Sequence, residues 1–532
     1  MVALTLALVV GATVVSALAR RVGVPSPIAL VIAGILVSLV PGLPDYQLDP
    51  ELVLFGFLPP LLYAQAINTS LRDLRANLRS ITLLSVGLVL ASTIAVGYVA
   101  HALLPGLPLT AGFVLGAIVA PPDALAAAAI ANRVGLPRRV VAILEGESLL
   151  NDATALVAYR IAIAAVVTGV FSYGEAVLRF LLVSVIGVGF GLALGFLVIH
   201  VRRLIDDPLI ENTVSLVTPF AAYLGAETLH GSGVLAVVVT GLVVARAAPL
   251  IVSSTTRLQG QAVWGMIAYV LQSLVFALIG LQLRQILAGL HGYSAAELAL
   301  YAGAVTLTLI VIRVVWVFPT AYLPRLLFPR IRARDPYPPW QAPAIVSWAG
   351  LRGVVSLAAA LAIPLTAGGA PFPGRDLILF LTFAVIVATL VLQGLTLPWV
   401  SRRLRIAGMD DDLPALEQAN AEHTTARLAL MRLDQIVAKG ALPGEVELRL
   451  RRDLEQRART AHAMLGPGAD DEHLPELVEG AVSAAATYAE ARRELLRVER
   501  EEAVRLWQRG EIGEEALQSL QRRLDLEEQQ IL

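Results

Sequence analysis

The 532-residue sequence contains no cysteine, only seven histidines and a single lysine, Lys439. Without cysteine, disulfide bonds, thiol chemistry and thiolate metal sites are excluded. Since histidine is also scarce and no nucleophile–base arrangement stands out, an enzyme is disfavoured. The net charge of −1 indicates no particular partner, and we expect neither a cofactor nor a nucleic-acid partner.

Charge is also scarce, and it is unevenly distributed. Only 16% of the residues are charged, whereas about a quarter are charged in an average soluble domain. Mean hydropathy is +0.72. Because arginine and glutamate become dense only after residue 400, we expect two domains, a transmembrane domain over 1–405 and a helical cytoplasmic tail over 412–532. The tail shows helical periodicity over 415–438, 448–464, 474–508 and 512–532. Whether it serves regulation, dimerisation or only as a scaffold stays open.

Long apolar runs are what the first 400 residues do contain. A run of about 20 apolar residues spans a hydrocarbon core of roughly 30 Å. The predicted fold is therefore an all-α polytopic membrane protein with about thirteen transmembrane helices. They lie near 2–19, 25–41, 50–68, 80–104, 108–131, 138–168, 175–200, 210–229, 232–248, 262–285, 294–323, 342–365 and 375–398. The first run has no basic residues before it and many more apolar runs follow, so we interpret it as a span rather than a cleaved signal peptide.

Arginine alternates between the loops that join these runs. It is concentrated at 20–21, 72–79, 133–139, 202–203, 246–257, 325–334 and 402–405, and the intervening loops hold little of it. Since basic loops stay in the cytoplasm, the pattern predicts an N-terminus outside and a cytoplasmic tail.

Two of the predicted spans are interrupted. The fifth contains Pro121 and Pro122, which remove two backbone donors. The twelfth contains Gly350, Arg352 and Gly353. Broken spans in corresponding halves are the best sequence pointer to a transporter site. Because spans five and twelve differ by an odd number, we expect an inverted repeat with two broken helices that cross, although no sequence identity between the halves is visible.

The segment 145–152, Glu-Gly-Glu-Ser-Leu-Leu-Asn-Asp, concentrates polar groups inside the sixth apolar run. Ionisable groups inside a membrane are costly and indicate function. Glu145, Ser148 and Asp152 share one helix face. A buried carboxylate at Asp152 can take either a proton or a small cation, and this competition suffices for exchange. Asn151 adds no second charge, which predicts electroneutral one-for-one exchange. The alternative is that Asp152 only joins helices.

Charged groups at the two breaks have two readings. Asp123 can neutralise the positive helix ends and Arg352 the negative ones. Backbone carbonyls freed by Pro121 and Pro122 can instead coordinate a cation. Arg352 is also a candidate partner for Glu147.

Other intramembrane polar residues are weaker signals. We expect Arg160 to anchor a packing contact, Arg313 to pair with an acid and Gln65 to line the cavity. A surface role is expected for Glu227 and His230, and Glu145 has no assigned role.

Three motifs resemble the Na+/H+ exchangers of the NhaP/NHE type, a family of monovalent cation:proton antiporters. They are the segment 145–152, Phe-Leu-Pro-Pro-Leu-Leu at 57–62 and Gly-Leu-Arg-Gly-Val-Val-Ser at 350–356. The resemblance covers nearly all of 1–400. It implies thirteen spans, a homodimer, a core domain that moves against a dimerisation domain, and electroneutral Na+/H+ exchange in a cell membrane.

The resemblance also implies the site residues. Asp152, Asn151 and Ser148 would bind the ion with Asp123 and the Pro122 carbonyl, the transported Na+ being held by Asp152, Ser148 and Pro122. Glu147 and Arg352 would form a structural ion pair. The family's Pro-Thr-Asp-Pro reads Pro-Pro-Asp-Ala at 121–124, and Gln65 stands where relatives often carry an acid.

These departures leave the choice of cation open. A K+/H+ or tail-gated K+ efflux antiporter is the alternative on the same scaffold, with an unknown regulator of the tail. An ion channel is the alternative of another class, although broken spans around a titratable acid favour alternating access.

Overall fold

The computed structural model describes residues 2–41, 50–123, 127, 134–169, 172–290, 292–406, 412–438 and 444–464, with the single positions 509 and 526. The chain divides into two compact units, Met1–Met409 and Asp410–Leu532. Each unit is described by itself.

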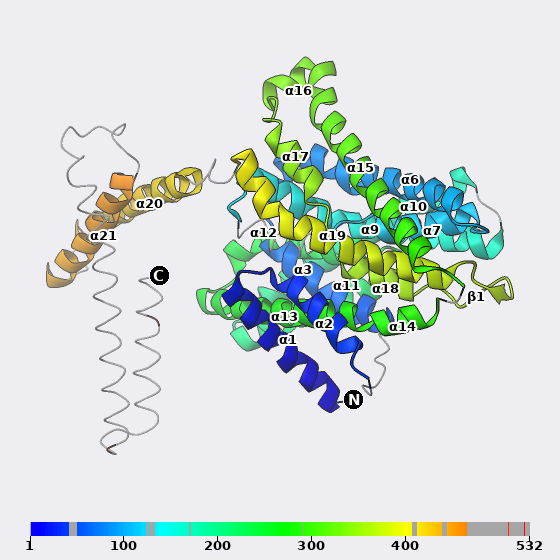
Figure 1. Cartoon of the computed structure of the whole chain (residues 1–532). Helices are drawn as coiled ribbons and strands as arrows, with labels where there is room; N and C mark the ends of the chain where they lie inside the picture. The colour runs from blue at the N-terminus through cyan, green and yellow to red at the C-terminus, as the bar shows by residue number, and fades with distance from the viewer. Residues whose placement is uncertain are drawn as a thin grey trace. The chain divides into compact units, whose positions relative to one another are not determined.

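The first unit is helical, with one short β-hairpin (Figure 1). Its helices before the first interruption are α1 (Val2–Val22), α2 (Ser26–Ser38), the π-helical turn η1 (Leu52–Phe57) leading into α3 (Leu58–Asn68), α4 (Leu71–Ala76), α5 (Leu78–Thr82), a second π-helical turn η2 (Leu83–Leu88), α6 (Val89–Leu103) and α7 (Leu109–Val119). There follow α9 (Arg138–Thr168), α10 (Tyr173–Arg202), α11 (Pro208–Thr228), α12 (Gly233–Ile251), α13 (Ser254–Leu281), α14 (Leu283–Ala288), α15 (Ala295–Leu327), α16 (Pro329–Arg334), α17 (Gln341–Trp348), α18 (Val354–Leu361), strands β1 (Thr366–Ala367) and β2 (Ala370–Pro371), and α19 (Arg375–Leu404).

Six helical stretches in the described residues are long and apolar enough to cross a membrane. They are 78–103, 138–168, 174–202, 255–288, 295–327 and 375–404, and shorter apolar helices cover 26–38, 52–68, 109–119 and 233–248. The helical membrane fold expected from the sequence is confirmed. The count of thirteen spans and the inverted repeat stay predictions.

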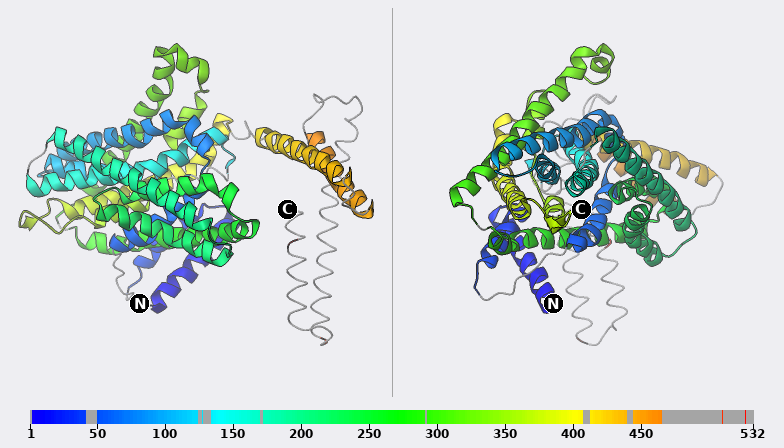
Figure 2. Two further views of the ribbon diagram at one scale, coloured as in Figure 1. Left: turned by 180° about the vertical axis from the view of Figure 1, so that it is seen from behind. Right: turned by 90° about the vertical axis from the view of Figure 1, so that its right-hand side faces the viewer.

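Helix α9 lies inside the group of helices, whereas α10 lies at its edge. In the most apolar part of α9, more than half of the residues are buried inside the protein. In the most apolar part of α10, little more than a quarter are buried. In the right-hand view of Figure 2, α9 is the cyan helix surrounded by others. The exposed apolar face of α10, with Val177, Leu181, Val185 and Phe196, suits lipid. The polar segment of α9 is thus carried into the interior.

Close packing of α7 against α6 fixes the first interruption. A Cβ atom added to Gly112 would lie 2.6 Å from the Gly97 carbonyl oxygen, and one added to Gly116 would lie 2.3 Å from that of Thr93. Small residues allow this approach between membrane helices. The end of α7 therefore has one position relative to α6.

Both interruptions lie where the sequence predicts them. Helix α7 ends at Val119, just before Pro121 and Pro122, because proline lacks the N–H that a helix needs. Helix α17 ends at Trp348 and α18 begins only at Val354. The two breaks contact each other, since the backbone N–H of Asp123 donates to the Leu351 carbonyl at 2.7 Å.

The second unit contains α20 (Asp412–Ala438) and α21 (Gly444–Met464), which pack together. Arg451 of α21 contacts Asp434 of α20 at 2.6 Å and also Glu447 of its own helix. These helices confirm the first two helical patterns of the tail. The patterns at 474–508 and 512–532 lie outside the described residues, position 526 excepted.

Candidate ion-binding site

The polar segment lies in the first half of α9. This helix starts after Pro137 and ends at Thr168, where it is capped by Gly169, whose φ of 70° is favoured by glycine. Its backbone groups are satisfied within the helix over most of its length, as a membrane requires. Four of its polar side chains, Glu147, Ser148, Asn151 and Asp152, are buried. Ser148 and Asp152 line a cavity, Asn151 contacts the first interruption and Glu147 forms an ion pair.

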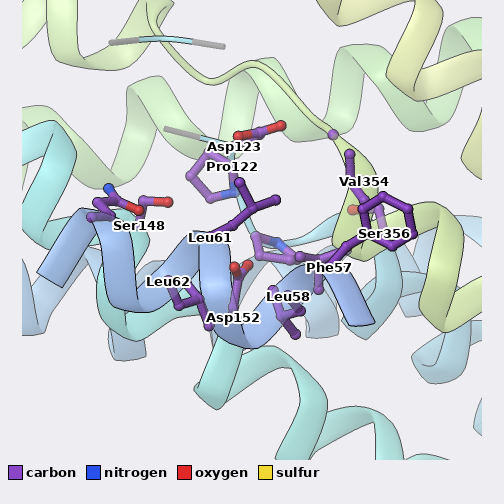
Figure 3. A pocket seen from close by; sticks show the side chains of 14 residues that line it. Phe57, Leu58, Leu61, Leu62, Pro122, Asp123, Ser148, Asp152, Val354 and Ser356 are labelled. Carbon is purple, nitrogen blue, oxygen red and sulfur yellow. The ribbon is translucent and has the colours of Figure 1, made fainter. Parts of the chain in front are cut away.

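Asp152 and Ser148 line a cavity of about 40 Å³ beside the first interruption. Figure 3 shows its wall, to which α3, the α7 break, α9 and α18 contribute. Its lining residues are Phe57, Leu58, Leu61, Leu62, Gln65, Pro121, Pro122, Asp123, Ser148, Asp152, Gly353, Val354, Val355 and Ser356. One water needs roughly 10–15 Å³ by this measure, so the space suits a cation that has lost most of its water.

Asp152 is one of two carboxylates that line this cavity, the other being Asp123. It is 7% exposed, and in the described part of the chain no cation forms an ion pair with it. A buried charge without a partner is costly. The expectation that Asp152 holds a proton or a cation stays a prediction.

Asn151 forms a hydrogen bond to the backbone of the first interruption. Its Nδ2 donates to the Pro122 carbonyl oxygen at 2.8 Å, and its side chain is fully buried. Its Oδ1 is buried without a hydrogen-bond partner. Asn151 thus holds Pro122 beside Asp152, and direct contact between Asn151 and the ion stays a prediction.

Glu147 pairs with Arg313, not with Arg352 as the sequence led us to expect. Nη1 and Nη2 of Arg313 donate to Oε1 and Oε2 of Glu147 at 2.6 and 2.7 Å. Both side chains are 1% exposed. The third donor, Nε of Arg313, reaches the Val346 carbonyl at 3.0 Å near the end of α17. The assigned pair of Glu147 and Arg352 was wrong, whereas the expected acid partner of Arg313 is confirmed.

Arg352 serves the backbone of the two breaks instead. Its Nε donates to the carbonyl of Val119, the last residue of α7, at 2.7 Å, and its Nη1 donates to the Gly350 carbonyl. A cation at a helix C-terminus opposes the negative end of the helix. The reading of Arg352 as a group that neutralises such an end is therefore confirmed. The sequence could not separate it from Arg313, because both arginines lie in apolar surroundings.

Asp123 lies at the start of α18. A Cβ atom built on Gly353 would fall 1.7 Å from its Oδ2, so only glycine fits there. Gly353 is the residue that precedes the first turn of α18. A carboxylate at this position opposes the positive end of the half-helix. Asp123 thus combines a structural position with a place on the cavity wall.

A second and larger cavity of about 580 Å³ adjoins the first. We call it the vestibule, and the two share Leu61 and Gln65 as wall residues. Its polar lining comprises Tyr63, Gln65, Asn68, Thr69, Glu145, Arg202, Asn212, Ser215, Thr256, Arg257, Gln261, Trp264 and Gln272. Several of these lie at the ends of α3, α10 and the start of α13, next to the arginine-rich loops.

The remaining candidates also have defined positions. Arg160 of α9 donates from Nη2 to both oxygens of Glu227 on α11 at 2.9 Å, so it anchors a contact between helices as expected. Gln65 lines both cavities. The buried pair of Arg202 and Glu211, at 3.3 Å, was missed, although an arginine beside an acid-bearing helix start was a usable signal.

Comparison with known proteins identifies the family. Residues 5–403 match the family described as "Sodium/hydrogen exchanger, transmembrane". The chain belongs to the sodium/hydrogen exchanger family. It is therefore a secondary transporter with several membrane spans and not an enzyme.

Three bacterial relatives show how similar the exchanger is to known proteins. It is 37% identical to an uncharacterized Na+/H+ exchanger of Mycobacterium bovis over all of this chain and 95% of the relative. It is 36% identical to the sodium, potassium, lithium and rubidium/H+ antiporter of Bacillus subtilis, over 70% of this chain and 57% of that protein. It is 33% identical to the Na+/H+ antiporter ApNhaP of Aphanothece halophytica, over 72% of this chain and 70% of that antiporter.

The fold of the exchanger also matches a solved structure. The sodium proton antiporter MjNhaP1 of Methanocaldococcus jannaschii superimposes with a TM-score of 0.59 at 16% identity. The match covers 76% of this chain and 98% of that antiporter. The match shows that this chain has the same fold as that antiporter.

Proposed function

We propose that this exchanger carries one Na+ (or Li+) in exchange for one H+ at Asp152, without net movement of charge. The observation that carries the proposal is the buried Asp152 carboxylate, which has no ion-pair partner in the described part of the chain and faces a small cavity. One carboxylate neutralises one monovalent charge, whether proton or cation. Asn151 adds no second titrating group.

Oxygen donors for the cation are available on the same wall. Ser148 lies one turn before Asp152, and Asp123 and Pro122 lie opposite on the break. The Pro122 carbonyl accepts one hydrogen bond from Asn151, but a carbonyl oxygen has two lone pairs. Asp152, Ser148 and Pro122 therefore form the proposed ligand set, with Asp123 adding negative charge. A proton on Asp152 removes the strongest of these ligands, so proton and cation compete.

The vestibule is the proposed access route in this conformation. Its lining includes Arg202, the last residue of α10, and Arg257, near the start of α13, and basic groups at the ends of spans favour the cytoplasmic side. We place the N-terminus outside and the tail in the cytoplasm of a bacterial plasma membrane. The assembly is a homodimer, by the family resemblance.

The test uses the full chain purified into liposomes with a pH-sensitive dye inside. Addition of Na+ to wild-type liposomes should move protons, and Asp152→Asn should abolish this movement. Cation-driven proton movement that survives Asp152→Asn would sink the assignment of Asp152. A rate that changes with a valinomycin-set membrane potential would sink electroneutrality.

A K+/H+ antiporter is the second candidate. The observation that favours it is the printed name of the Bacillus subtilis relative, which includes potassium and rubidium beside sodium and lithium. The same liposomes given Na+, Li+ and K+ in turn decide between the two. Proton movement with K+ alone would favour K+ efflux, and movement of cation without protons would indicate a channel.

A further inference from the structure

Glu145 is an acid of α9 for which the site described above has no use. It lies seven residues before Asp152 on the same helix face, which corresponds to about 10 Å along the axis. Its side chain is partly buried and lines the vestibule, not the ion cavity. Ser148 lies between the two acids. Glu145, Ser148 and Asp152 thus form a row of oxygen atoms from the vestibule to the ion cavity.

The charges around Glu145 leave its carboxylate available. In the described part of the chain it forms no ion pair, and it is the single acid of the described vestibule lining. Arg202 in the same lining is occupied by Glu211, and Arg257 donates to the Val252 carbonyl. The negative charge of Asp73 on α4 repels the Glu145 carboxylate. Asp73 is itself paired with Arg138 at 3.1 Å, so it does not compete for a cation in the vestibule.

Gln65 connects the vestibule to the ion cavity, because it lines both. Its amide oxygen is a neutral ligand that a passing cation can use. The vestibule, at about 580 Å³, holds a cation together with its water, whereas the 40 Å³ cavity holds one that has lost most of it. A cation that enters by this route meets a carboxylate before it has to be dehydrated.

We propose that Glu145 forms an entry site for a hydrated monovalent cation in the vestibule, upstream of Asp152. The inference rests on the proposed exchange at Asp152. A carboxylate in a cavity with low-dielectric walls raises the local concentration of cations. A higher local concentration lets the cation reach Asp152 at a lower bulk concentration. Glu145 should therefore lower the KM for the cation.

The test measures Na+-driven proton movement in everted membrane vesicles, in which added Na+ meets the cytoplasmic face. Glu145→Gln should raise the KM for Na+ about three- to tenfold, with a much smaller change in maximal rate. Glu145→Asp should restore most of the affinity. Arg257→Gln removes the opposite charge from the same cavity and should lower KM.

Two controls separate charge in the vestibule from other causes. Glu175→Gln removes an equal charge at the start of α10, outside the vestibule, and should leave KM unchanged. Added choline chloride should shrink the difference between wild type and Glu145→Gln, because salt screens such a field. Unchanged KM in both Glu145→Gln and Arg257→Gln would overturn the entry site.

The same vesicles distinguish this inference from the proposed function. Loss of exchange in Asp152→Asn together with a normal KM in Glu145→Gln overturns only the entry site. Exchange that persists in Asp152→Asn overturns the proposed function itself. If Glu145→Gln does not accumulate in the membrane, the KM values of Glu145→Asp and Arg257→Gln decide.

Discussion

Arg313 on α15 binds both carboxylate oxygens of Glu147 on α9, at 2.6 and 2.7 Å, in a place where neither side chain reaches solvent. The same guanidinium also binds the backbone of α17 through Val346. One arginine therefore joins the helix that carries Asp152 to the first half of the second broken span. Neither residue of the pair lines the ion cavity.

Separating this pair should be more damaging than separating an exposed one. Arg313→Ala leaves Glu147 buried and uncompensated, at a cost of about 3–5 kcal/mol. Arg160→Gln, whose side chain is half exposed in its pair with Glu227, should cost about 1 kcal/mol or less. Thermal unfolding of the purified variants in one detergent gives the comparison. Equal melting temperatures for the two would contradict the structural role of Arg313.

The double variant Glu147→Leu with Arg313→Met tests the same pair from the other side. Replacing both members of a buried pair by apolar residues is often neutral or stabilising. The double variant should therefore melt well above Arg313→Ala. An additive loss in the double variant would show that each residue has an independent role.

Asn151→Asp should impair exchange more than Asn151→Ala. Either change removes the donor to the Pro122 carbonyl, and loss of one buried partner costs about 1–3 kcal/mol. The aspartate also places a second negative charge next to Asp152, and its carboxylate oxygen would face the Pro122 carbonyl oxygen, where both groups are acceptors. Exchange rates in liposomes, normalised to the amount of folded protein, measure the difference. Asn151→Asp with a wild-type rate would show that the donor to Pro122 is dispensable.

Gly353→Ala should abolish exchange and lower the melting temperature. Its methyl group would fall 1.7 Å from Oδ2 of Asp123, so the contact between the two breaks has to open. Gly303→Ala is the matched control, because a Cβ atom there meets nothing within 4 Å and alanine favours a helix. It should keep wild-type activity. Retention of exchange in Gly353→Ala would mean that Asp123 can leave its position without harm.

Asp335 should confer a stability that depends on pH. It accepts hydrogen bonds from Arg79, Arg139 and Arg325. Partial burial raises the pKa of Asp335, but the hydrogen bonds from Arg139 and Arg325 outweigh this and leave the pKa below its ordinary value. A depressed folded-state pKa gives stability that is present above the unfolded value, about 3.9, and is lost as pH falls through the folded value.

Asp335→Asn should therefore be less stable than wild type at neutral pH, by on the order of 1 kcal/mol, since solvent screens the group. The difference should be constant from pH 8 to about 5 and should shrink only below about pH 4. Melting temperatures measured across this range test it, with the exposed Asp376→Asn as control. A difference that shrinks between pH 7 and 5 would contradict the assignment.

The sequence was sufficient to predict features that depend on backbone chemistry. Pro121 and Pro122 cannot continue a helix, so the end of α7 at Val119 follows from their positions alone. The interruption at 349–353 was predicted from Gly350 and Gly353, and it too is present. Burial of Asp152 and Ser148 follows from the apolar residues on both sides of them.

The partner of Glu147 could not be predicted, because pairing depends on how α15 is rotated and shifted against α9. Two buried arginines, Arg313 and Arg352, were available, and both are compatible with the rule that a membrane charge needs a partner. The difference comes from the carbonyls freed at the end of α7, which occupy Arg352. Had the carbonyls freed at the end of α7 been counted as possible partners for an arginine, Arg313 would have been favoured as the partner of Glu147.

The hydrogen bond from the Asp123 N–H to the Leu351 carbonyl joins the two broken spans to each other. A movement that keeps this hydrogen bond and exposes the site first to one side and then to the other would displace both half-spans together. The donors around Asp152 that come from these spans would then travel as a set. The cation would be carried with its coordination intact, instead of being passed from one group of ligands to another.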